Sequence, residues 1–145
     1  MTTIAWDGKT VAADTQANNT GLRSYTKKLY RLADGRIYGF TGEIQDGVSV
    51  YEWLNAGGRD ARPHVSSSFA ALLVCPDGRA YTMEDKLVLL AVYETFRAIG
   101  SGRNFAMGAL VVGADAVQAV KAAIRLDVYS GGDIDALEVE GAGRR

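Results

Sequence analysis

The sequence predicts an α+β fold in which antiparallel β-sheets are covered on their outer sides by helices. Strand-like segments occur in pairs around short Asp-Gly turns, as they do in β-hairpins. One helix-like segment interrupts these strands, and a pair of helix-like segments then precedes a last strand. Strands and helices therefore do not alternate one by one, as the βαβ units of a parallel sheet would require.

The first part of the chain predicts two hairpins. Their turns are the Asp-Gly pairs at 7–8 and 34–35, because this dipeptide tolerates the positive φ angles of a tight turn. The segments between these turns are either strand-like or, over one polar stretch, loop-like. In chain order they are strands at 3–6 and 9–14, a polar loop at 15–25, and strands at 26–32 and 36–41.

The middle of the chain begins with a helix and then returns to strands. Ile44, Val48, Tyr51 and Leu54 recur at helical spacing, and the Gly-Gly pair at 57–58 ends the helix. The segments that follow are a loop at 59–67, a third hairpin with strands at 68–75 and 79–83, and one or two strands within 87–99.

The last third predicts two helices and a final strand. The helices cover 104–112 and 114–129 and are broken near Gly113. A turn at 130–132, a strand at 134–139 and a frayed tail at 140–145 complete the chain. We find no internal repeat and no linker, so we expect a single domain over residues 1–145.

Composition excludes several classes of protein. A net charge of -1 provides no general attraction to nucleic acid. The apolar runs are too short to span a bilayer and we find no signal peptide, so we expect no membrane association. Cys75 and His64 are the only residues of their kinds, which excludes an internal disulfide and a Cys/His zinc site. A single cysteine also fits a reducing compartment, and we expect a cytoplasmic protein.

Three charged residues occupy positions where the pattern expects apolar side chains. Lys28 shares a predicted strand face with Tyr30 and Leu32, Asp14 ends the second strand, and Asp127 lies on the apolar stripe of the last helix. A buried charge is costly unless it is paired. The pattern alone is therefore compatible with a structural ion-pair cluster as well as with a catalytic site.

A set of short motifs occurs along the chain in a recognisable order. They are Thr2-Thr3-Ile4, Ala12-Ala13-Asp14, Lys27-Lys28-Leu29, Gly39-Phe40-Thr41-Gly42, Ala98-Ile99-Gly100-Ser101-Gly102 and Asp127-Val128-Tyr129-Ser130-Gly131-Gly132. Each motif is weak alone, but together they resemble proteasome β subunits and, most closely, the bacterial proteasome-like peptidase HslV. The resemblance covers nearly the whole chain except about residues 55–94.

This resemblance implies the αββα sandwich of the N-terminal nucleophile (Ntn) hydrolases, in which two antiparallel sheets lie between helix layers. It also implies that Thr2 is the catalytic residue. Its hydroxyl would be the nucleophile, and its α-amino group, freed by removal of Met1, would be the general base. A terminal amine has a pKa of about 7.7–8.0, so it can accept a proton near neutral pH.

The resemblance assigns roles to the other motif residues. Lys28 would favour the neutral amine and the developing alkoxide through its positive charge, and Asp14 would hold Lys28 charged and oriented. The backbone N–H of Gly42 would form the oxyanion hole. The network that orients the Thr2 amine would consist of Ser101, Asp127 and Ser130, and Phe40 would line the substrate pocket.

The chain departs from the family in three places. Glu43 follows Gly42 where the family has a second glycine or another small residue, and its carboxylate either disturbs the oxyanion site or points away as a first-turn helix acid. The stretch 44–67 has room for one helix and a loop, which predicts a shortened outer helix layer. The sequence also begins with Met1, and the Thr2 nitrogen cannot act as a base until Met1 has been removed.

The predicted function is that of a threonine-type endopeptidase that cleaves peptides or unfolded proteins. The resemblance implies assembly into a hexameric or heptameric ring and an AAA+ ATPase unfoldase as a possible partner, with no cofactor and no catalytic metal. Two alternatives stay open. The first is a catalytically silent structural or regulatory ring subunit, and the second is an Ntn amidase that acts on a small amide.

Overall fold

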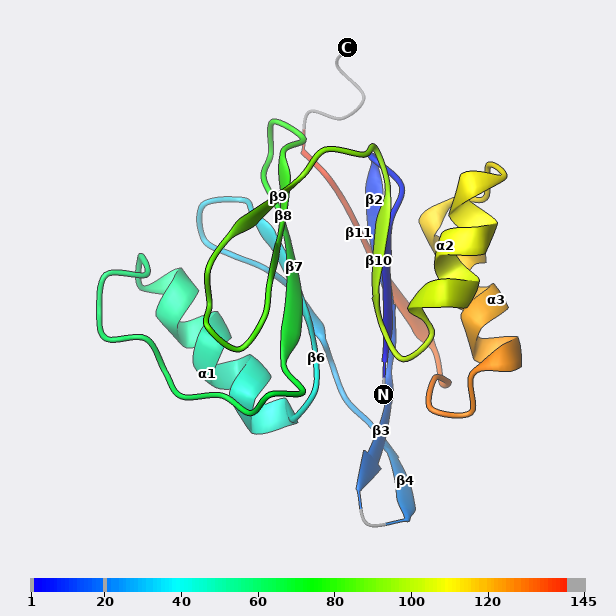
Figure 1. The fold of residues 1–145 in the computed structure, drawn as a ribbon, viewed down its shortest axis with the longest axis horizontal. Coiled ribbons are helices and arrows are strands. Elements are labelled where there is room, and N and C mark those ends of the chain that lie inside the picture. Colours follow the sequence, from blue (N-terminus) through cyan, green and yellow to red (C-terminus); the bar gives the residue numbers. More distant parts are fainter. Residues whose placement is uncertain (1, 20, 141–145) are drawn as a thin grey trace.

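The computed structural model of the protein describes residues 2–19 and 21–140, and these form four layers (Figure 1). Helix α1 (Ile44–Asn55) forms one outer layer. A five-stranded and a four-stranded sheet face each other in the centre. Helices α2 (Arg103–Val111) and α3 (Ala116–Leu126) form the other outer layer. The order of layers is helix, sheet, sheet, helices, which confirms the predicted αββα sandwich with its shortened outer layer over one sheet.

The four-stranded sheet has the order β10-β1-β2-β11, and every neighbouring pair is antiparallel. Its strands are β1 (Thr3–Trp6), β2 (Thr10–Asp14), β10 (Arg97–Gly100) and β11 (Ile134–Glu138). The predicted Asp-Gly turn joins β1 to β2, and Gly8 has a φ of 97°. This sheet places the N-terminal strand in the centre, with the late segments of the chain on both sides of it.

The five-stranded sheet has the order β5-β6-β7-β8-β9 and is also antiparallel. Its strands are β5 (Leu29–Arg31), β6 (Ile37–Thr41), β7 (Ala70–Val74), β8 (Ala80–Met83) and β9 (Leu90–Val92). The segment predicted as one or two strands at 87–99 is divided between the sheets. Its first part forms β9 here, and its second part forms β10 of the other sheet.

Strands in the middle of the sandwich are buried on both faces. In β1, Ile4 packs into the space between the sheets, where it contacts a cluster that includes Leu72 of β7. Ala5, on the opposite face of β1, packs against the helix pair α2 and α3. The small side chain of Ala5 faces Ala106 and Ala119, so the helices can approach this sheet closely. On the other side of the sandwich, Tyr38, Phe40, Val50 and Leu54 belong to the core between the five-stranded sheet and α1.

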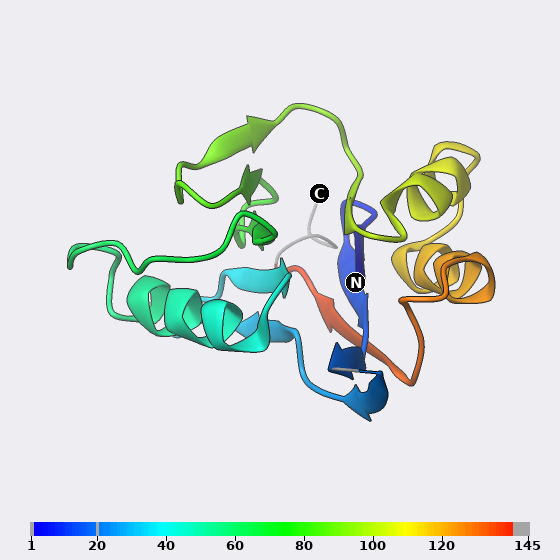
Figure 2. The same ribbon diagram turned by 60° about the horizontal axis from the view of Figure 1, so that its bottom comes forward.

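The polar segment 15–25 was predicted as a loop, and this is wrong. It forms a hairpin of β3 (Gln16–Asn19) and β4 (Leu22–Tyr25), which extends from the sandwich next to the N-terminus (Figures 1 and 2). Most residues of β4 are exposed. A two-stranded ribbon with little buried surface lacks the alternation of apolar and polar residues that identifies a strand in a sequence.

Two element boundaries differ from the prediction in ways that matter for charged residues. Strand β5 begins at Leu29, so Lys28 precedes the strand instead of sharing a face with Tyr30 inside it. Helix α3 ends at Leu126, and Asp127 is its C-terminal cap with extended backbone angles (φ -96°, ψ 117°). The predicted removal of Met1 and most of the predicted frayed tail, residues 141–145, lie outside the described residues.

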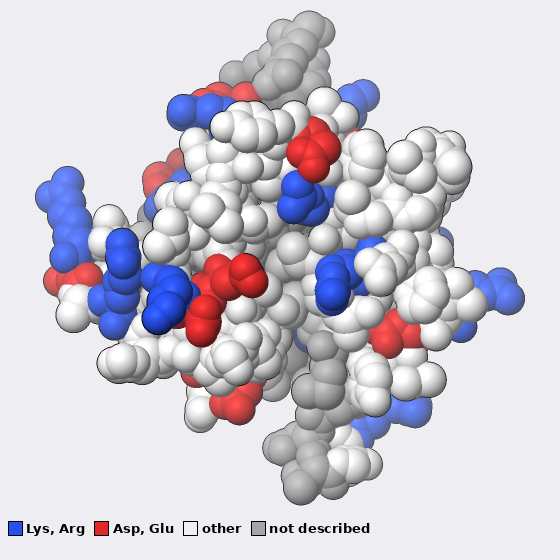
Figure 3. Space-filling model, in the orientation of Figure 1, with Lys and Arg blue, Asp and Glu red and all other residues white. Residues whose placement is uncertain are grey.

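The surface carries charges of both signs. On the face shown in Figure 3, Lys and Arg side chains are interspersed with Asp and Glu, and large uncharged areas separate them. Among the described residues, no helix is long and apolar enough to cross a membrane.

Candidate active site

Thr2 immediately precedes β1 and is tightly enclosed by the last residue of β10 and the turn that follows it. Its exposed fraction is 2%. Gly100 makes this enclosure possible, because a Cβ atom at this position would lie 1.9 Å from the Thr2 carbonyl oxygen and 3.1 Å from the Thr41 methyl group. Gly100 also has a φ of 100°, which favours glycine. The Ala98–Gly102 motif therefore contains a glycine because the N-terminal segment passes directly against it.

Asp14 and Lys28 form a buried ion pair beside Thr2. The Lys28 Nζ atom lies 3.0 Å from Asp14 Oδ1, and the exposed fractions of the two side chains are 3% and 0%. The same oxygen accepts a hydrogen bond from the Thr3 backbone N–H at 2.9 Å. Because the ammonium and the Thr3 N–H share one carboxylate oxygen, Lys28 lies next to the Thr2–Thr3 peptide bond.

The remaining polar atoms of this pair are also satisfied. The Gly131 backbone N–H donates to Asp14 Oδ2 at 3.0 Å, and Lys28 donates a second hydrogen bond to the Gln16 carbonyl oxygen. Burial lowers the pKa of Lys28 below its ordinary value, although the charge of Asp14 and the hydrogen bond to it act in the opposite direction. The ammonium is therefore held in a site where its loss of a proton is easier than in water.

A second group of polar residues surrounds the Thr2 nitrogen. The Thr2 backbone nitrogen donates to Ser101 Oγ at 3.0 Å. Ser101 Oγ donates in turn to Asp127 Oδ2 at 2.6 Å, and Ser130 Oγ donates to the same oxygen at 2.7 Å. The three residues that the resemblance assigns to amine orientation are thus connected to each other and to Thr2.

Asp127 is the acceptor at the centre of this group. Burial alone would raise the pKa of Asp127, but the hydrogen bonds from Ser101, Ser130 and the Tyr129 backbone N–H favour its ionised form. The pKa of Asp127 consequently lies below its ordinary value. The ionised Asp127 carboxylate can therefore orient both serine hydroxyls near neutral pH.

Thr3 connects the two groups, and sequence reasoning assigned it no role. Its backbone N–H binds Asp14, and its Oγ1 atom lies 2.8 Å from Ser130 Oγ. Gly102 packs against this position so closely that a Cβ atom there would lie 2.0 Å from Thr3 Oγ1. Thr3 belongs to one of the motifs and is polar, although it is the first residue of the predicted strand at 3–6. A polar side chain at that strand position was the signal that could have identified it. Nothing in the sequence singles out the Gln16 carbonyl, because any residue type supplies one.

Gly42 lies at the turn from β6 into α1, next to Thr41. Its φ is 105°, and a Cβ atom there would lie 3.0 Å from the Ser68 carbonyl oxygen and 3.1 Å from Phe69 Cα. Glycine is therefore required at this turn for backbone reasons. In the described part of the chain, the Gly42 N–H donates no hydrogen bond to another residue. It is available to a ligand, as an oxyanion-hole donor would have to be.

Phe40 and Glu43 flank this glycine in the sequence but differ in their surroundings. The Phe40 ring is buried between the sheet and α1, where it packs against Gly47, and its exposed fraction is 1%. Its role in substrate binding stays a prediction. Glu43 is exposed at the position that precedes α1, and its carboxylate makes no capping hydrogen bond to the helix.

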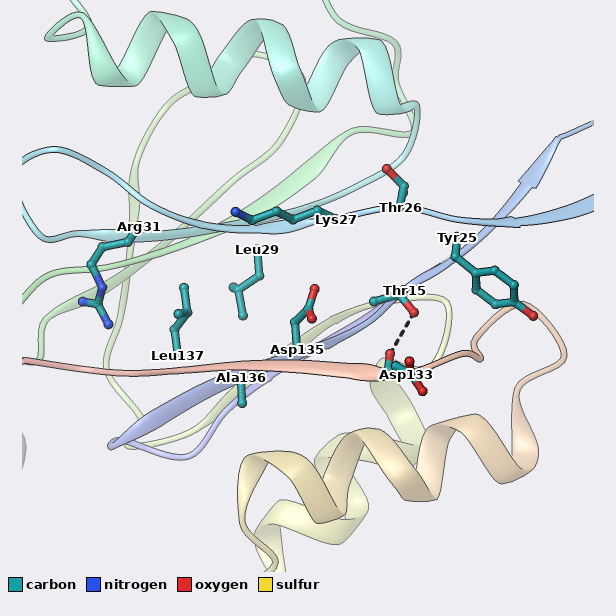
Figure 4. Close-up of a pocket in the computed structure, with 10 residues that line it drawn as sticks. All are labelled: Thr15, Tyr25, Thr26, Lys27, Leu29, Arg31, Asp133, Asp135, Ala136 and Leu137. Carbon is teal, nitrogen blue, oxygen red and sulfur yellow. Dashed lines mark hydrogen bonds between the residues drawn. The ribbon is translucent and has the colours of Figure 1, made fainter.

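A groove of about 740 Å³ lies elsewhere, between the edge strands β5 and β11 of the two sheets (Figure 4). Leu29, Leu137 and Asp135 point into it from the two strands, and Thr15 and Asp133 close one end through a hydrogen bond of 2.8 Å. None of its lining residues belongs to the network around Thr2. The candidate active site is therefore the network around Thr2, and this groove is separate from it.

The described residues contain no group of three or more His, Cys, Asp or Glu side chains arranged to hold a metal ion. The carboxylates at the site, Asp14 and Asp127, each accept several protein hydrogen bonds or an ion pair. The arrangement consists of a threonine at the chain start, a buried ammonium and an ionised carboxylate that orients hydroxyl groups. Chemically, this set can support attack by a hydroxyl group on a carbonyl carbon.

Comparisons with known proteins agree with the fold. No protein-family model and no curated protein matches the sequence. Among solved structures, Thiobacillus denitrificans BPH is 18% identical with a TM-score of 0.75, over 96% of this chain and 97% of that chain. BPH in complex with epoxomicin is 20% identical with a TM-score of 0.72, over 96% and 97% of the two chains.

HslV from Trypanosoma brucei, a eukaryotic HslV, is 22% identical with a TM-score of 0.72. This similarity covers 95% of this chain and 99% of that chain, so neither protein has a large unmatched part. Identities at this level show that the backbones are arranged alike, and they do not show that the activity is shared. The chain has the proteasome-like and HslV-like Ntn fold.

Proposed function

We propose that this protein is a threonine peptidase that hydrolyses peptide bonds through an acyl-enzyme on Thr2. The observation that carries the proposal is the hydrogen bond of 3.0 Å between the Thr2 nitrogen and Ser101, which is itself oriented by Asp127. An ordinary strand residue has no need for such a polar network around its backbone nitrogen. A general base that must be held in one orientation does need it.

The proposed reaction begins when the free Thr2 amine takes the proton of the Thr2 hydroxyl. The hydroxyl oxygen attacks the peptide carbonyl carbon, and the negative charge that develops on the carbonyl oxygen is stabilised by the Gly42 N–H. The amine then donates its proton to the leaving amine of the substrate, and an ester on Thr2 remains. Water hydrolyses this ester in the second half of the reaction, again with the amine as base.

Lys28 acts in this scheme through its charge. Its position next to the Thr2–Thr3 peptide bond, on a carboxylate oxygen shared with the Thr3 N–H, supports a role in stabilising the developing alkoxide of Thr2. The reaction requires removal of Met1, because an acylated nitrogen cannot accept a proton. Threonine is small enough to permit ordinary removal of the preceding methionine.

We further propose that the protein works as a ring of identical subunits in the cytoplasm, with unfolded protein as substrate and an AAA+ ATPase as possible partner. Support comes from apolar side chains on two different sides of the molecule. One set lies at the ends of α2 and α3 and includes Val112 and Val128, which are 84% and 80% exposed. The other set surrounds β9 and includes Leu90 and Tyr93. Two different surfaces permit head-to-tail contacts, which close into rings.

A catalytically silent ring subunit is the second candidate. It is favoured by the exposed carboxylate of Glu43 directly after Gly42, because a negative charge there opposes an oxyanion. It is also favoured by the single helix over the five-stranded sheet, which departs from the two helices of the active family members.

The decisive experiment compares the parent protein with Thr2→Ala and Thr2→Ser after intact-mass measurement of each. We expect parent protein without Met1 to hydrolyse an unstructured protein and short fluorogenic peptides. Thr2→Ala should lose about 10³-fold or more of this activity, the scale expected for an activated nucleophile, while Thr2→Ser retains a hydroxyl and part of the activity. Undiminished hydrolysis by Thr2→Ala would place the nucleophile elsewhere. Processed but inactive parent protein would favour the silent subunit, and activity on small amides alone would favour the amidase.

A further inference from the structure

We propose that Glu43 selects the substrate, by favouring peptides with a basic side chain next to the scissile bond over neutral or acidic ones. This inference rests on the proposed peptidase function and adds a substrate class to it. Glu43 is exposed, and no Lys or Arg among the described residues forms an ion pair with it. The Glu43 carboxylate accepts a hydrogen bond of 3.2 Å from Gln45 Nε2.

The position of Glu43 follows from the packing around Gly100. The Thr41 methyl group and the Thr2 carbonyl oxygen both lie against this glycine, so the end of β6 is next to the proposed nucleophile. Glu43 is two residues further along the chain, a span of at most about 7 Å between Cα atoms. In Figures 1 and 2, the end of α1 that follows Glu43 lies toward the N-terminal end of β1.

The structural uses of a carboxylate at this position are already met by another residue. Asp46, in the first turn of α1, is buried and accepts a hydrogen bond of 2.9 Å from the Ser66 backbone N–H. Glu43 is exposed, and its side chain makes no capping hydrogen bond to the helix. On this turn it is the acid that faces solvent, where a bound peptide would meet it.

The surrounding charges determine the sign of the effect. Lys28 is paired with Asp14, so its charge offsets the field of Glu43 only in part. A partly compensated carboxylate within about one Debye length of the reacting carbonyl, about 10 Å at 0.1 M ionic strength, opposes the negative charge of the oxyanion. A cationic substrate side chain removes this penalty and adds an attraction. Neutral peptides should therefore react more slowly than basic ones in the parent protein.

The test compares the parent with Glu43→Gln and with Glu52→Gln as a matched control. Glu52 is an exposed carboxylate on the same helix, nine residues further on and therefore about 13 Å along the helix axis. The substrates are peptides identical except for Lys, Gln or Glu on the amino side of the scissile bond. Their kcat/KM values are measured at low and high salt, with thermal melting as a check of folding.

We expect Glu43→Gln to lower the ratio of kcat/KM for the Lys peptide over the Gln peptide by about two- to fivefold, the scale of an exposed charge interaction. It should raise kcat/KM for the Gln and Glu peptides, Glu52→Gln should change neither, and high salt should reduce the difference. Equal ratios in parent and Glu43→Gln would overturn the inference while leaving the peptidase function intact. Absence of hydrolysis of every peptide by processed parent protein would overturn the proposed function itself, and this inference with it.

Discussion

Lys28 and Asp14 form an ion pair that joins the two sheets of the sandwich, with Nζ 3.0 Å from Oδ1 and both side chains almost completely buried. Asp14 ends β2 in one sheet, and Lys28 immediately precedes β5 in the other. The pair is surrounded by backbone donors and acceptors from Thr3, Gln16 and Gly131. It therefore contributes both to the cohesion of the fold at this end and to the electrostatics of the candidate site.

Breaking this pair should destabilise the protein strongly. We expect Asp14→Asn to cost about 3–5 kcal/mol, because it leaves a buried ammonium without its countercharge. The matched control is Asp34→Asn, which breaks an ion pair of similar length (Arg36 Nε to Asp34 Oδ2, 2.8 Å) in which Asp34 is 56% exposed. That change should cost about 0–1 kcal/mol. Urea unfolding of both variants measures the difference, and similar losses would show that the buried pair is not special.

Lys28 should be as important for activity as the nucleophile. We expect Lys28→Ala to lose about as much activity as Thr2→Ala. When residues act as one unit, removing any one of them costs about as much activity as removing all of them. Lys28→Arg should fail as well, since a planar guanidinium does not fit the site of a compact ammonium. Lys27→Ala is the control, because Lys27 is exposed and its ammonium lies over the Tyr30 ring. A Lys28→Ala variant with nearly full activity would contradict the catalytic assignment.

The dependence of activity on pH should be bell-shaped. On the acid side, kcat/KM should rise as the Thr2 amine loses its proton, with a pKa of about 7.7–8.0. On the alkaline side, activity should fall as Lys28 loses its charge, and burial places this step below the ordinary lysine value of 10.5. A kcat/KM that stays constant up to pH 10.5 would show that the Lys28 charge is not required.

The lowered pKa of Lys28 also affects the stability of the fold, in the direction opposite to its effect on activity. The folded-state pKa of Lys28 is lowered, so its charged form costs stability at pH values below that pKa, and the cost is relieved as pH rises toward 10.5. Activity and the Lys28 contribution to stability should therefore change in opposite directions in the alkaline range. Unfolding of the parent and of Lys28→Met between pH 7 and pH 10 isolates this contribution, which should be present only in the parent.

Loss of the Ser101 hydroxyl should affect the reaction more than the fold. We expect Ser101→Ala to lower kcat about 10²-fold or more, because the Thr2 amine loses the acceptor that orients it. The acid limb of the pH profile should also shift, since Asp127 no longer acts on the amine through Ser101. Ser68→Ala is a control that removes an exposed hydroxyl of the same type. An unchanged pH profile together with a lower melting temperature would assign Ser101 a purely structural role.

Self-association should depend on the apolar ends of the helix pair. Light scattering at micromolar concentration should detect a hexamer or heptamer, and Val112→Asp should shift it toward smaller species because Val112 is 84% exposed and apolar. Asn104→Asp in the first turn of α2, at the other end of the same helix, adds the same charge without removing apolar area and should leave the assembly unchanged. A monomeric parent protein would argue against a ring and favour the amidase.

The sequence was sufficient for much of the fold because the signals are local. Asp-Gly turns, helical spacing from Ile44 and the glycine pair after Leu54 depend only on neighbouring residues, and the structure confirms the elements they predict. The hairpin of β3 and β4 was missed because it buries too little surface to leave an apolar pattern. Lys28 and Asp127 were assigned to elements that they adjoin, since a periodic pattern does not indicate the residue at which an element ends.

The contacts of the candidate site were decided by the tertiary structure. The order of motifs along the chain identified Asp14, Lys28, Ser101, Asp127 and Ser130 as a set, but only the crossing of β1 between β2 and β10 brings them around Thr2 and Thr3. Hydrogen bonds between residues about a hundred positions apart have no local signature in a sequence. The sequence by itself determined which chemical groups are present and which elements carry them. The packing of the two sheets decided which of those groups meet, because burial of the core sets distances in space independently of separation along the chain.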